Sequence, residues 1–360
     1  MRARGQPAGH DRHQERLARR PGLLSVSPTT LLLAATILTA AVFDFTNGFH
    51  DTANAIATAV STRAMSPRAA VAVAAVLNLA GALVTVVVFG SAVSNTIASL
   101  LKQPTIPILI AGLLGAIAWN LITWYGGLPS SSTHALIGGL IGAAIAADGG
   151  LSGINWSAVS RVVTWLVLSP PLGFAVAAVF MVGLYRFVGQ RRPVPLNRRF
   201  RQLQILTSAF ISYSHGANDA QKSMAAMTMA LVATGHLSHF QVPLWVVLLA
   251  AAAIGFGTYA GGWRIIRTVG WRIYKIEPAT GMGAQLTGAA VIQLATVFGY
   301  PVSTTHVLTG AVIGAGAPRR LDVAGWGLGA TMLTAWIVTI PAAAAVGWLA
   351  YAILHTAQVG

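Results

Sequence analysis

The sequence predicts an all-α integral membrane protein with about ten (10–12) transmembrane segments. We expect two inverted-topology repeats whose helices are broken at the membrane midplane. Of the 360 residues, 55% are hydrophobic and only 9% are charged, whereas a soluble domain carries about 25% charged residues. Long apolar stretches recur along the chain, and two polar motifs within them occur twice in the same order. These observations indicate a multi-pass protein of the cell membrane.

The charge balance and the lack of cysteine exclude several kinds of function. The chain has 23 Lys and Arg against 8 Asp and Glu, a formal net charge of +15, and no Cys. In a membrane protein such an excess indicates basic loops on the cytoplasmic side, so we expect no nucleic-acid partner. Without Cys there are neither disulfides nor thiolate metal sites. The polar, Arg-rich residues 1–27 are expected to form a disordered basic tail.

Ten apolar stretches follow, of a length that can cross a bilayer. The first five lie at about 29–60, 69–90, 107–125, 130–147 and 159–187. The second five lie at about 202–232, 243–262, 279–298, 300–316 and 322–353. We therefore expect a first transmembrane repeat at 28–187, a basic cytoplasmic linker at 188–201 and a second, inverted repeat at 202–354.

Duplicated motifs relate the two halves. The matching pairs are NGFHDTAN at 47–54 with HGANDAQK at 215–222, PSSSTHALIGGLIGA at 129–143 with PVSTTHVLTGAVIGA at 301–315, and TWLVLSPP at 164–171 with AWIVTIPA at 335–342. Their nearly equal offsets indicate one duplicated unit. An odd number of spans per unit makes the second copy enter the membrane from the opposite side, as in many secondary transporters.

The basic residues of the loops support this arrangement. If the tail is outside and the spans alternate, the outer loops hold only Lys102 and Arg161. The inner loops then hold Arg63, Arg68, Arg186, Arg191, Arg192, Arg198, Arg199, Arg201, Arg264, Arg267, Arg272, Lys275, Arg319 and Arg320. This asymmetry is the positive-inside pattern, which only the basic tail does not follow.

Two carboxylates, Asp51 and Asp219, occupy matching positions at membrane depth. An intramembrane carboxylate costs about 2.5–3.5 kcal/mol of insertion free energy. A purely structural role is a poor explanation for two such carboxylates at matching positions. Asn54 shares a helix face with Asp51, and such oxygen ligands suit Na⁺, Mg²⁺ or a titrating proton. Gly48 and Gly216 precede the carboxylates, and we expect the helices to break there, next to protein or a watery cavity.

Asp44 and Lys222 also lie within predicted spans. For Asp44, a structural role and a functional role are equally compatible with the sequence. Lys222 is expected to form an ion pair with Asp219 at i+3. Alternatively, Lys222 contacts an anion, or its side chain extends so that the ammonium group reaches the membrane interface.

A proline followed by hydroxyl residues and a histidine occurs at 129–134 and at 301–306, before an apolar run. This pattern predicts a helix N-terminus, whose free N–H groups and positive dipole end bind oxyanions without a lysine. Two such ends would face each other near the midplane, with capping of two ordinary helices as the alternative. His134 and His306 end these motifs, either as buried neutral side chains or in proton relay or substrate contact.

On these residues the chain resembles the inorganic phosphate transporter (PiT) family. That family has a duplicated signature close to Gly-Ala-Asn-Asp-x-x-Asn-Ala and a repeated Pro-x-Ser-[Ser/Thr]-[Ser/Thr]-His turn. Here the signature reads GFHDTANA at 48–55 and GAND at 216–219. His50 and Lys222 replace asparagines of the family pattern, as in the bacterial low-affinity branch. The resemblance covers about residues 29–353.

The resemblance implies secondary active import of inorganic phosphate, also as a metal–phosphate complex, coupled to H⁺ or, because of Lys222, less favourably to Na⁺. It implies no resident cofactor, leaves any metal ligands unknown, and suggests a homodimer in membrane lipid. The implied substrate-binding residues are Asn47, Ser131, Ser132, Thr133, Asn218, Lys222, Ser303, Thr304 and Thr305. The implied coupling-cation residues are Asp51, Asn54, Thr58 and Asp219.

Three alternatives stay open. Helix ends and hydroxyl groups bind sulfate or another tetrahedral oxyanion as well as phosphate. An intramembrane hydrolase would use Ser131 or Ser303 with a histidine, but a catalytic centre seldom occurs twice by inverted symmetry, so we expect no enzyme. A passive channel conflicts with the charges at the midplane and with the inverted repeats.

Overall fold

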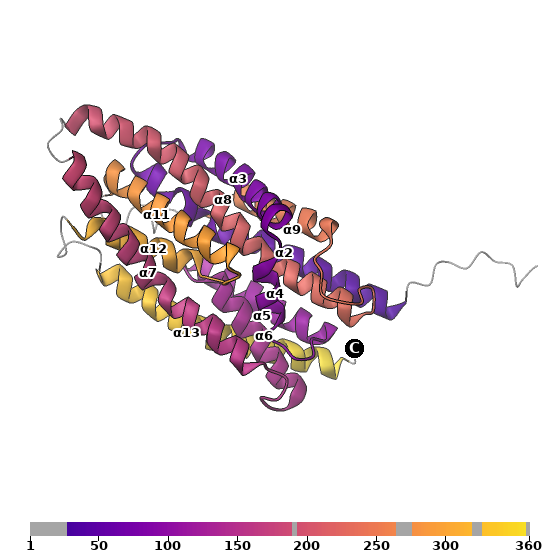
Figure 1. Ribbon diagram of the computed structural model, residues 1–360. Helices are drawn as coiled ribbons and strands as arrows, with labels where there is room; N and C mark the ends of the chain where they lie inside the picture. The colour runs from indigo at the N-terminus through magenta and orange to yellow at the C-terminus, as the bar shows by residue number, and fades with distance from the viewer. Residues whose placement is uncertain (1–26, 189–192, 264–275, 319–325, 358–360) are drawn as a thin grey trace, which may run out of the picture.

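The computed structural model describes residues 27–188, 193–263, 276–318 and 326–357, which are almost entirely helical (Figure 1). The described helices are α2 (Pro28–Ser61), α3 (Pro67–Phe89), α4 (Ala92–Ala98), α5 (Ile106–Tyr125), α6 (Ser132–Asp148), α7 (Trp156–Val188), α8 (Pro193–Ala233), α9 (Leu244–Ala260), α11 (Pro278–Val297), α12 (Thr304–Gly316) and α13 (Trp326–Thr356). Except for residue 27, the predicted tail at 1–27 lies outside the described residues.

Each predicted apolar stretch coincides with one of these helices, and local sequence explains where several of them begin. α2 and α3 both start with a proline that follows a serine. Ser27 Oγ accepts a hydrogen bond from the Thr30 amide at 3.2 Å, and Ser66 Oγ accepts one from the Ala69 amide at 3.3 Å. A proline suits the first helical position because an N–H there would have no partner. α4, with 7 residues, is too short to appear as an apolar stretch.

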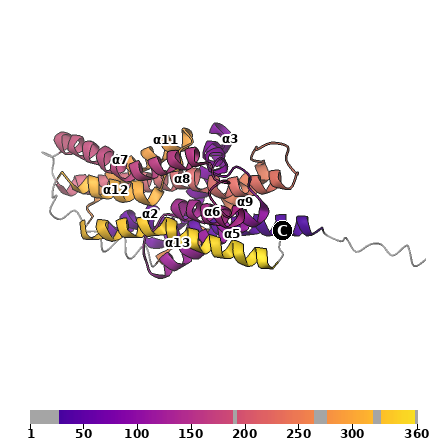
Figure 2. The same cartoon turned by 90° about the horizontal axis from the view of Figure 1, so that it is seen from below.

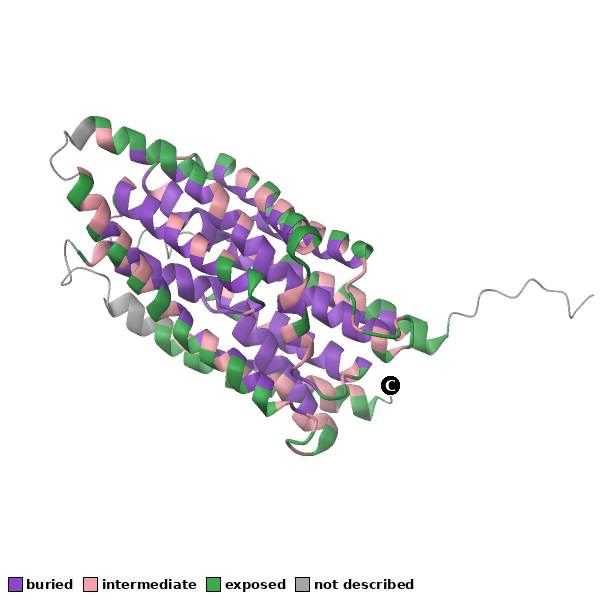
Figure 3. Cartoon of the chain, in the orientation of Figure 1, coloured by how far each residue is buried: buried purple, intermediate pink, exposed green. Residues whose placement is uncertain are grey.

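Within the described part of the chain, five helical segments are long and apolar enough to cross a membrane, namely Pro28–Ser61, Pro67–Phe89, Ile106–Tyr125, Trp156–Val188 and Leu333–Thr356. The helices run side by side in one elongated bundle (Figures 1 and 2). Buried residues follow its middle and exposed residues its outside (Figure 3). Large apolar side chains such as Phe187 and Val179 are 85% and 74% exposed, as expected for surfaces that face lipid.

Residues 193–201 of the predicted linker form the first turns of α8, which begins at Pro193. The helix therefore begins about nine residues before its apolar stretch, which starts at about 202. Residues 189–192, near the start of that segment, lie outside the described part of the chain.

The expected helix breaks at Gly48 and Gly216 are wrong. α2 (34 residues) and α8 (41 residues) are continuous α-helices through these positions. A Cβ atom on Gly48 would lie 2.4 Å from the Ile254 carbonyl oxygen of α9, and one on Gly216 would lie 2.0 Å from the Asn78 carbonyl oxygen of α3. The two glycines therefore allow neighbouring backbones to approach.

The interruptions fall at the hydroxyl turns instead. Residues 126–131 join α5 to α6, and residues 298–303 join α11 to α12. With 17 and 13 residues, α6 and α12 are about 25 and 20 Å long, which is less than the hydrocarbon core of about 30 Å. Because Ser131 and Ser303 are only 1% exposed, both helices begin inside the bundle.

The short helices pack against long helices of the other half of the chain. α6 packs against α13, and α12 packs against α7. A Cβ atom on Gly142 of α6 would lie 2.0 Å from the Ala344 carbonyl oxygen, and one on Gly314 of α12 would lie 2.2 Å from the Phe174 carbonyl oxygen. α3 packs against α8 and α9 against α2 in the same crosswise manner.

Two apolar clusters lie on either side of a polar centre. The first cluster includes Leu33 and Phe43 of α2 with Met224 and Leu231 of α8. The second cluster includes Ala53 and Ala57 of α2 with Phe200 and Ile211 of α8. Since the clusters follow one another in opposite order along the two helices, α2 and α8 run antiparallel. The polar residues between them, at 44–52 and 212–219, share one level.

Candidate functional site

Asp51 of α2 is surrounded by donors from three helices. His50 Nδ1 lies 2.7 Å from its Oδ1, and the hydroxyl of Ser132, in the first turn of α6, donates to its Oδ2 at 3.2 Å. Thr305 Oγ1, in the first turn of α12, lies 3.5 Å from Oδ1. The side chain of Asp51 is 2% exposed. Both short helices therefore point their first turns at this carboxylate.

Asp219 of α8 is joined to Asp51 by a histidine. His215 Nε2 lies 3.2 Å from Asp219 Oδ2 and 3.7 Å from Asp51 Oδ2. Asn47 Nδ2 also donates to Asp219 Oδ2, at 3.3 Å. All of these side chains are buried. The two matched carboxylates predicted from the sequence therefore belong to one cluster.

Lys222 links this cluster to α6. Its Nζ lies 2.9 Å from Asp219 Oδ2 and donates to Ser132 Oγ at 3.0 Å and Thr133 Oγ1 at 3.1 Å. The ion pair expected from the i+3 spacing is thus present. The side chain of Lys222 is 0% exposed, so its ammonium group is held between Asp219 and the first turn of α6.

The two hydroxyl turns cap their own helices and hold each other. Ser131 Oγ accepts from the His134 amide at 3.2 Å, and Ser303 Oγ accepts from the His306 amide at 3.3 Å. Thr133 Oγ1 donates to the Val302 carbonyl at 3.2 Å, and Thr305 Oγ1 donates to the Ser130 carbonyl at 3.1 Å. These two bonds join matching positions of the duplicated motifs.

The rings of His134 and His306 lie next to each other. Their ring centroids are 4.5 Å apart, and the His306 ring lies 3.7 Å from the Trp336 ring. Both histidines are buried. Their rings therefore pack the α6–α12 contact behind the hydroxyl turns.

The remaining predicted residues differ in how closely they join the cluster. Asn54 Nδ2 donates to Thr305 Oγ1 at 2.8 Å. Asn218 Nδ2 donates to Thr296 Oγ1 at 2.8 Å, on the side of α11. Thr304 is buried in the first turn of α12. Thr58 is buried one turn beyond Asn54, and its hydroxyl has no hydrogen-bond partner among the described residues.

Several acceptor atoms in the cluster receive no hydrogen bond from the described residues. These atoms are Oδ1 of Asn47, Oδ1 of Asn218 and Oδ1 of Asp219. A buried polar atom without a partner is costly, and unpaired oxygens next to carboxylates are suited to a cation or to a donor on a ligand. Asp51, His215 and Asp219 each offer one ligand atom, and these three atoms lie within 4.8 Å of one another. Two carboxylates and an imidazole are a ligand set that could hold a divalent metal.

Sequence reasoning missed His215 as a site residue and left His50 without a site role. His50 Nε2 lies 3.1 Å from Thr123 Oγ1 of α5, so His50 joins Asp51 to the α5–α6 turn. Both histidines could have been found from the repeat. At an offset of 168 residues, His215 stands where the first copy has Asn47, and His50 stands where the second copy has Asn218.

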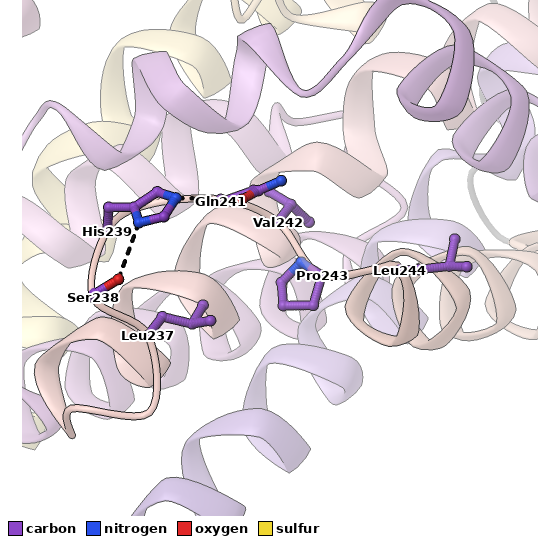
Figure 4. Close-up of a pocket in the computed structure, with 7 residues that line it drawn as sticks. All are labelled: Leu237, Ser238, His239, Gln241, Val242, Pro243 and Leu244. Carbon is purple, nitrogen blue, oxygen red and sulfur yellow. Dashed lines mark hydrogen bonds between the residues drawn. The ribbon is translucent and has the colours of Figure 1, made fainter.

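A surface pocket between α8 and α9 is separate from this cluster. It is lined by Leu237, Ser238, His239, Gln241, Val242, Pro243 and Leu244 (Figure 4). His239 lies between Ser238 Oγ at 3.1 Å and Gln241 Oε1 at 3.3 Å. None of the residues of the buried cluster lines this pocket, so it is a feature of the loop.

Comparison with known proteins gives one consistent result. Residues 47–347 match the phosphate transporter family. A Bacillus subtilis (strain 168) protein named "Probable low-affinity inorganic phosphate transporter" is 45% identical over 329 residues, covering 90% of this chain and 98% of that protein. A Mycobacterium tuberculosis (strain ATCC 25618 / H37Rv) protein of the same name is 46% identical over 330 residues, covering 90% and 78%. A solved structure, "The sodium-dependent phosphate transporter", has a TM-score of 0.80 at 26% identity and covers 91% of this chain and 99% of that one.

Proposed function

The chain belongs to the phosphate transporter family, and from this premise we propose that it imports inorganic phosphate by secondary active transport coupled to H⁺. The family consists of transporters, so the chain is a multi-pass membrane transporter and not an intramembrane hydrolase. The single observation that carries proton coupling is the position of Lys222, whose ammonium group lies 2.9 Å from Asp219. A fixed ammonium group beside Asp219 would repel a Na⁺ ion that approached this carboxylate. Coupling to Na⁺ is therefore the less favoured form of the proposal.

The proposed phosphate site lies between the first turns of α6 and α12. The substrate-binding residues would be Asn47, Ser131, Ser132, Thr133, Asn218, Lys222, Ser303, Thr304 and Thr305. Two helix N-termini and one ammonium group supply positive potential to an oxyanion. Asp51, Asn54, Thr58 and Asp219 would serve the coupling cation. The contacts of Ser132 with both Asp51 and Lys222 support an arrangement in which anion and proton binding influence each other.

Ten spans in two inverted repeats, at 28–187 and 202–354, form the architectural part of the proposal. The antiparallel course of α2 and α8 between the two apolar clusters supports inversion. The crosswise packing of α6 on α13 and of α12 on α7 supports it as well. Movement of one repeat against the other around a fixed central site would then give alternating access.

A metal–phosphate complex is the second candidate substrate. The ligand atoms of Asp51, His215 and Asp219, within 4.8 Å of one another, favour it. In this form the metal ion is cargo, and the two carboxylates would contact its charge while the hydroxyl turns contact phosphate oxygens. Mg²⁺-dependent phosphate uptake would support this candidate, and uptake unchanged by chelation would exclude it.

The experiment that tests the proposal is uptake of radiolabelled phosphate into proteoliposomes. Phosphate uptake by the wild type and by Asp219→Asn is measured under three conditions: a pH gradient alone, a Na⁺ gradient alone, and added Mg²⁺. We expect uptake driven by the pH gradient and lost in the variant. Uptake that requires Na⁺ would contradict proton coupling. Transport of sulfate in place of phosphate would contradict the substrate.

A further inference from the structure

Asp44 is a third buried carboxylate, and the proposed site does not use it. It is 0% exposed and lies on α2 two turns before Asp51, about 10 Å along the helix. Its Oδ2 accepts a hydrogen bond from Ser223 Oγ of α8, and its Oδ1 has no hydrogen-bond partner among the described residues. An ionised carboxylate that is fully buried and has only one neutral donor is costly, so its burial favours a bound proton.

The charges that act on Asp44 come from one face of α8. They belong to Lys222, Asp219 and His215. On the other helices that pack against α2, the described titratable groups lie elsewhere. These groups are the exposed Arg68, Tyr125 and Tyr259 of α3, α5 and α9, and His306 of α12, whose ring packs against His134 and Trp336. Lys222 and His215 are the basic groups on that face of α8, and Lys222 directly precedes Ser223, the hydrogen-bond partner of Asp44.

The pair of Asp44 and Ser223 has no counterpart in the other repeat. At the offset of 168 residues, Asp44 corresponds to Ser212 and Ser223 corresponds to Ala55. Ser212 Oγ donates to the Ser208 carbonyl within its own helix. Asp51 and Asp219, in contrast, occur in both copies. Asp44 therefore does not belong to the matched pair of Asp51 and Asp219, and this leaves it free for a role that the two do not share.

We propose that Asp44 binds the transported proton and that Lys222 moves between Asp219 and Asp44 as the proton leaves and returns. The inference rests on the proposed proton-coupled import. A proton from outer water forms the O–H bond of Asp44, and the same bond breaks when the proton enters inner water, so nothing is oxidised or reduced. With Asp44 protonated, Lys222 stays on Asp219, Ser132 and Thr133, as observed. Ionised Asp44 draws Lys222 away from these hydroxyl groups, which weakens the phosphate site.

Because such coupling is reciprocal, two fluxes must be measured in the same proteoliposomes. Radiolabelled phosphate reports substrate movement, and a trapped pH-sensitive dye reports proton entry. We expect Asp44→Asn to lose uptake driven by a pH gradient and to lose phosphate-dependent proton entry, while it still exchanges phosphate at equal concentrations on both sides. Asp44→Glu is expected to keep both fluxes. Asp148→Asn, which changes an exposed carboxylate at the end of α6, serves as the control.

The outcomes separate this inference from the proposed function. If Asp44→Asn retains pH-driven uptake and proton entry, the role of Asp44 is wrong and proton-coupled import stands. If the wild type moves phosphate without protons, both are wrong. Should Asp44→Asn not fold, Ser223→Ala removes the one donor to the ionised carboxylate. It is expected to shift the pH of half-maximal uptake upward by about one unit, and an unchanged profile would overturn the inference.

Discussion

Lys222 is the residue at which the two halves of the polar cluster meet. Its ammonium group is fully buried and makes three contacts, with Asp219, Ser132 and Thr133. A buried charge is tolerated only where such partners are present. The lysine replaces the amide that the first repeat has at Asn54, so the second repeat exchanges an oxygen ligand for a fixed positive charge.

Replacement of this charge tests the choice of coupling ion. Lys222→Asn is expected to reduce pH-driven phosphate uptake about 10- to 100-fold, since a hydrogen bond to a charged group contributes about 1.5–3 kcal/mol. The uptake that remains should be stimulated by Na⁺, because an oxygen ligand returns. Lys102→Asn, at an exposed lysine, is the control. Wild-type uptake in Lys222→Asn would contradict this reading of the site.

Thr305 allows a test with a matched pair of variants. Its hydroxyl accepts from Asn54 and donates to the Ser130 carbonyl. Thr305→Val keeps the shape of the side chain but leaves these partners unpaired, and we expect about tenfold lower phosphate uptake. Thr305→Ser retains the hydroxyl and should retain most of the uptake. Equal uptake by the two variants would show that the hydroxyl is not required.

At this scale the sequence predicted the residues better than their partners. The duplicated carboxylates pointed to Asp51 and Asp219. The i+3 spacing pointed to the ion pair between Lys222 and Asp219. The position of His215 between the carboxylates depends on how two antiparallel helices face each other. A single copy of the motif carries no information about this packing. Comparison of the copies position by position would have marked it.

Among the elements, the short helices α6 and α12 depend on glycine for their contacts. Gly142 and Gly314 each lie against a carbonyl oxygen of the long helix of the opposite half. Such contacts hold membrane helices together because lipid provides no hydrophobic drive between them. The start of each helix is thereby fixed at the level of the carboxylates.

A methyl group added at this contact should separate the helices. Gly142→Ala would place a Cβ 2.0 Å from the Ala344 carbonyl oxygen, and we expect a loss of about 1–3 kcal/mol of stability. Gly150→Ala, where nothing lies within 4 Å, is the matched control. Thermal unfolding in detergent measures both variants. Equal midpoints would mean that α6 and α13 do not pack this closely.

The sequence located the helices but misplaced their breaks. Gly48 and Gly216 were expected to interrupt α2 and α8, because glycine next to an intramembrane carboxylate fits either a break or a close contact. Only the neighbouring backbones of α9 and α3 decide between these roles. The hydroxyl turns were identified correctly as helix starts, because proline and a capping serine determine a start locally.

For the whole molecule, the proposed inversion fixes which loops share a side of the membrane. Since the chain has no cysteine, single cysteines can report it without background. Lys102→Cys and Ser238→Cys, one in each repeat, should react with a membrane-impermeant maleimide in intact cells. Arg68→Cys should react only after permeabilisation. Labelling of Arg68→Cys from outside, together with Lys102→Cys, would contradict the proposed topology.

The crosswise packing of α6 on α13 and of α12 on α7 has a consequence for assembly. Each half of the chain completes the other, in the way that two subunits do when they exchange a segment in a domain-swapped dimer. Neither half, made alone, would bury its short helix or find the partner for its hydroxyl turn. A chain cut between 188 and 193 should therefore give two fragments that are degraded separately and become stable when produced together.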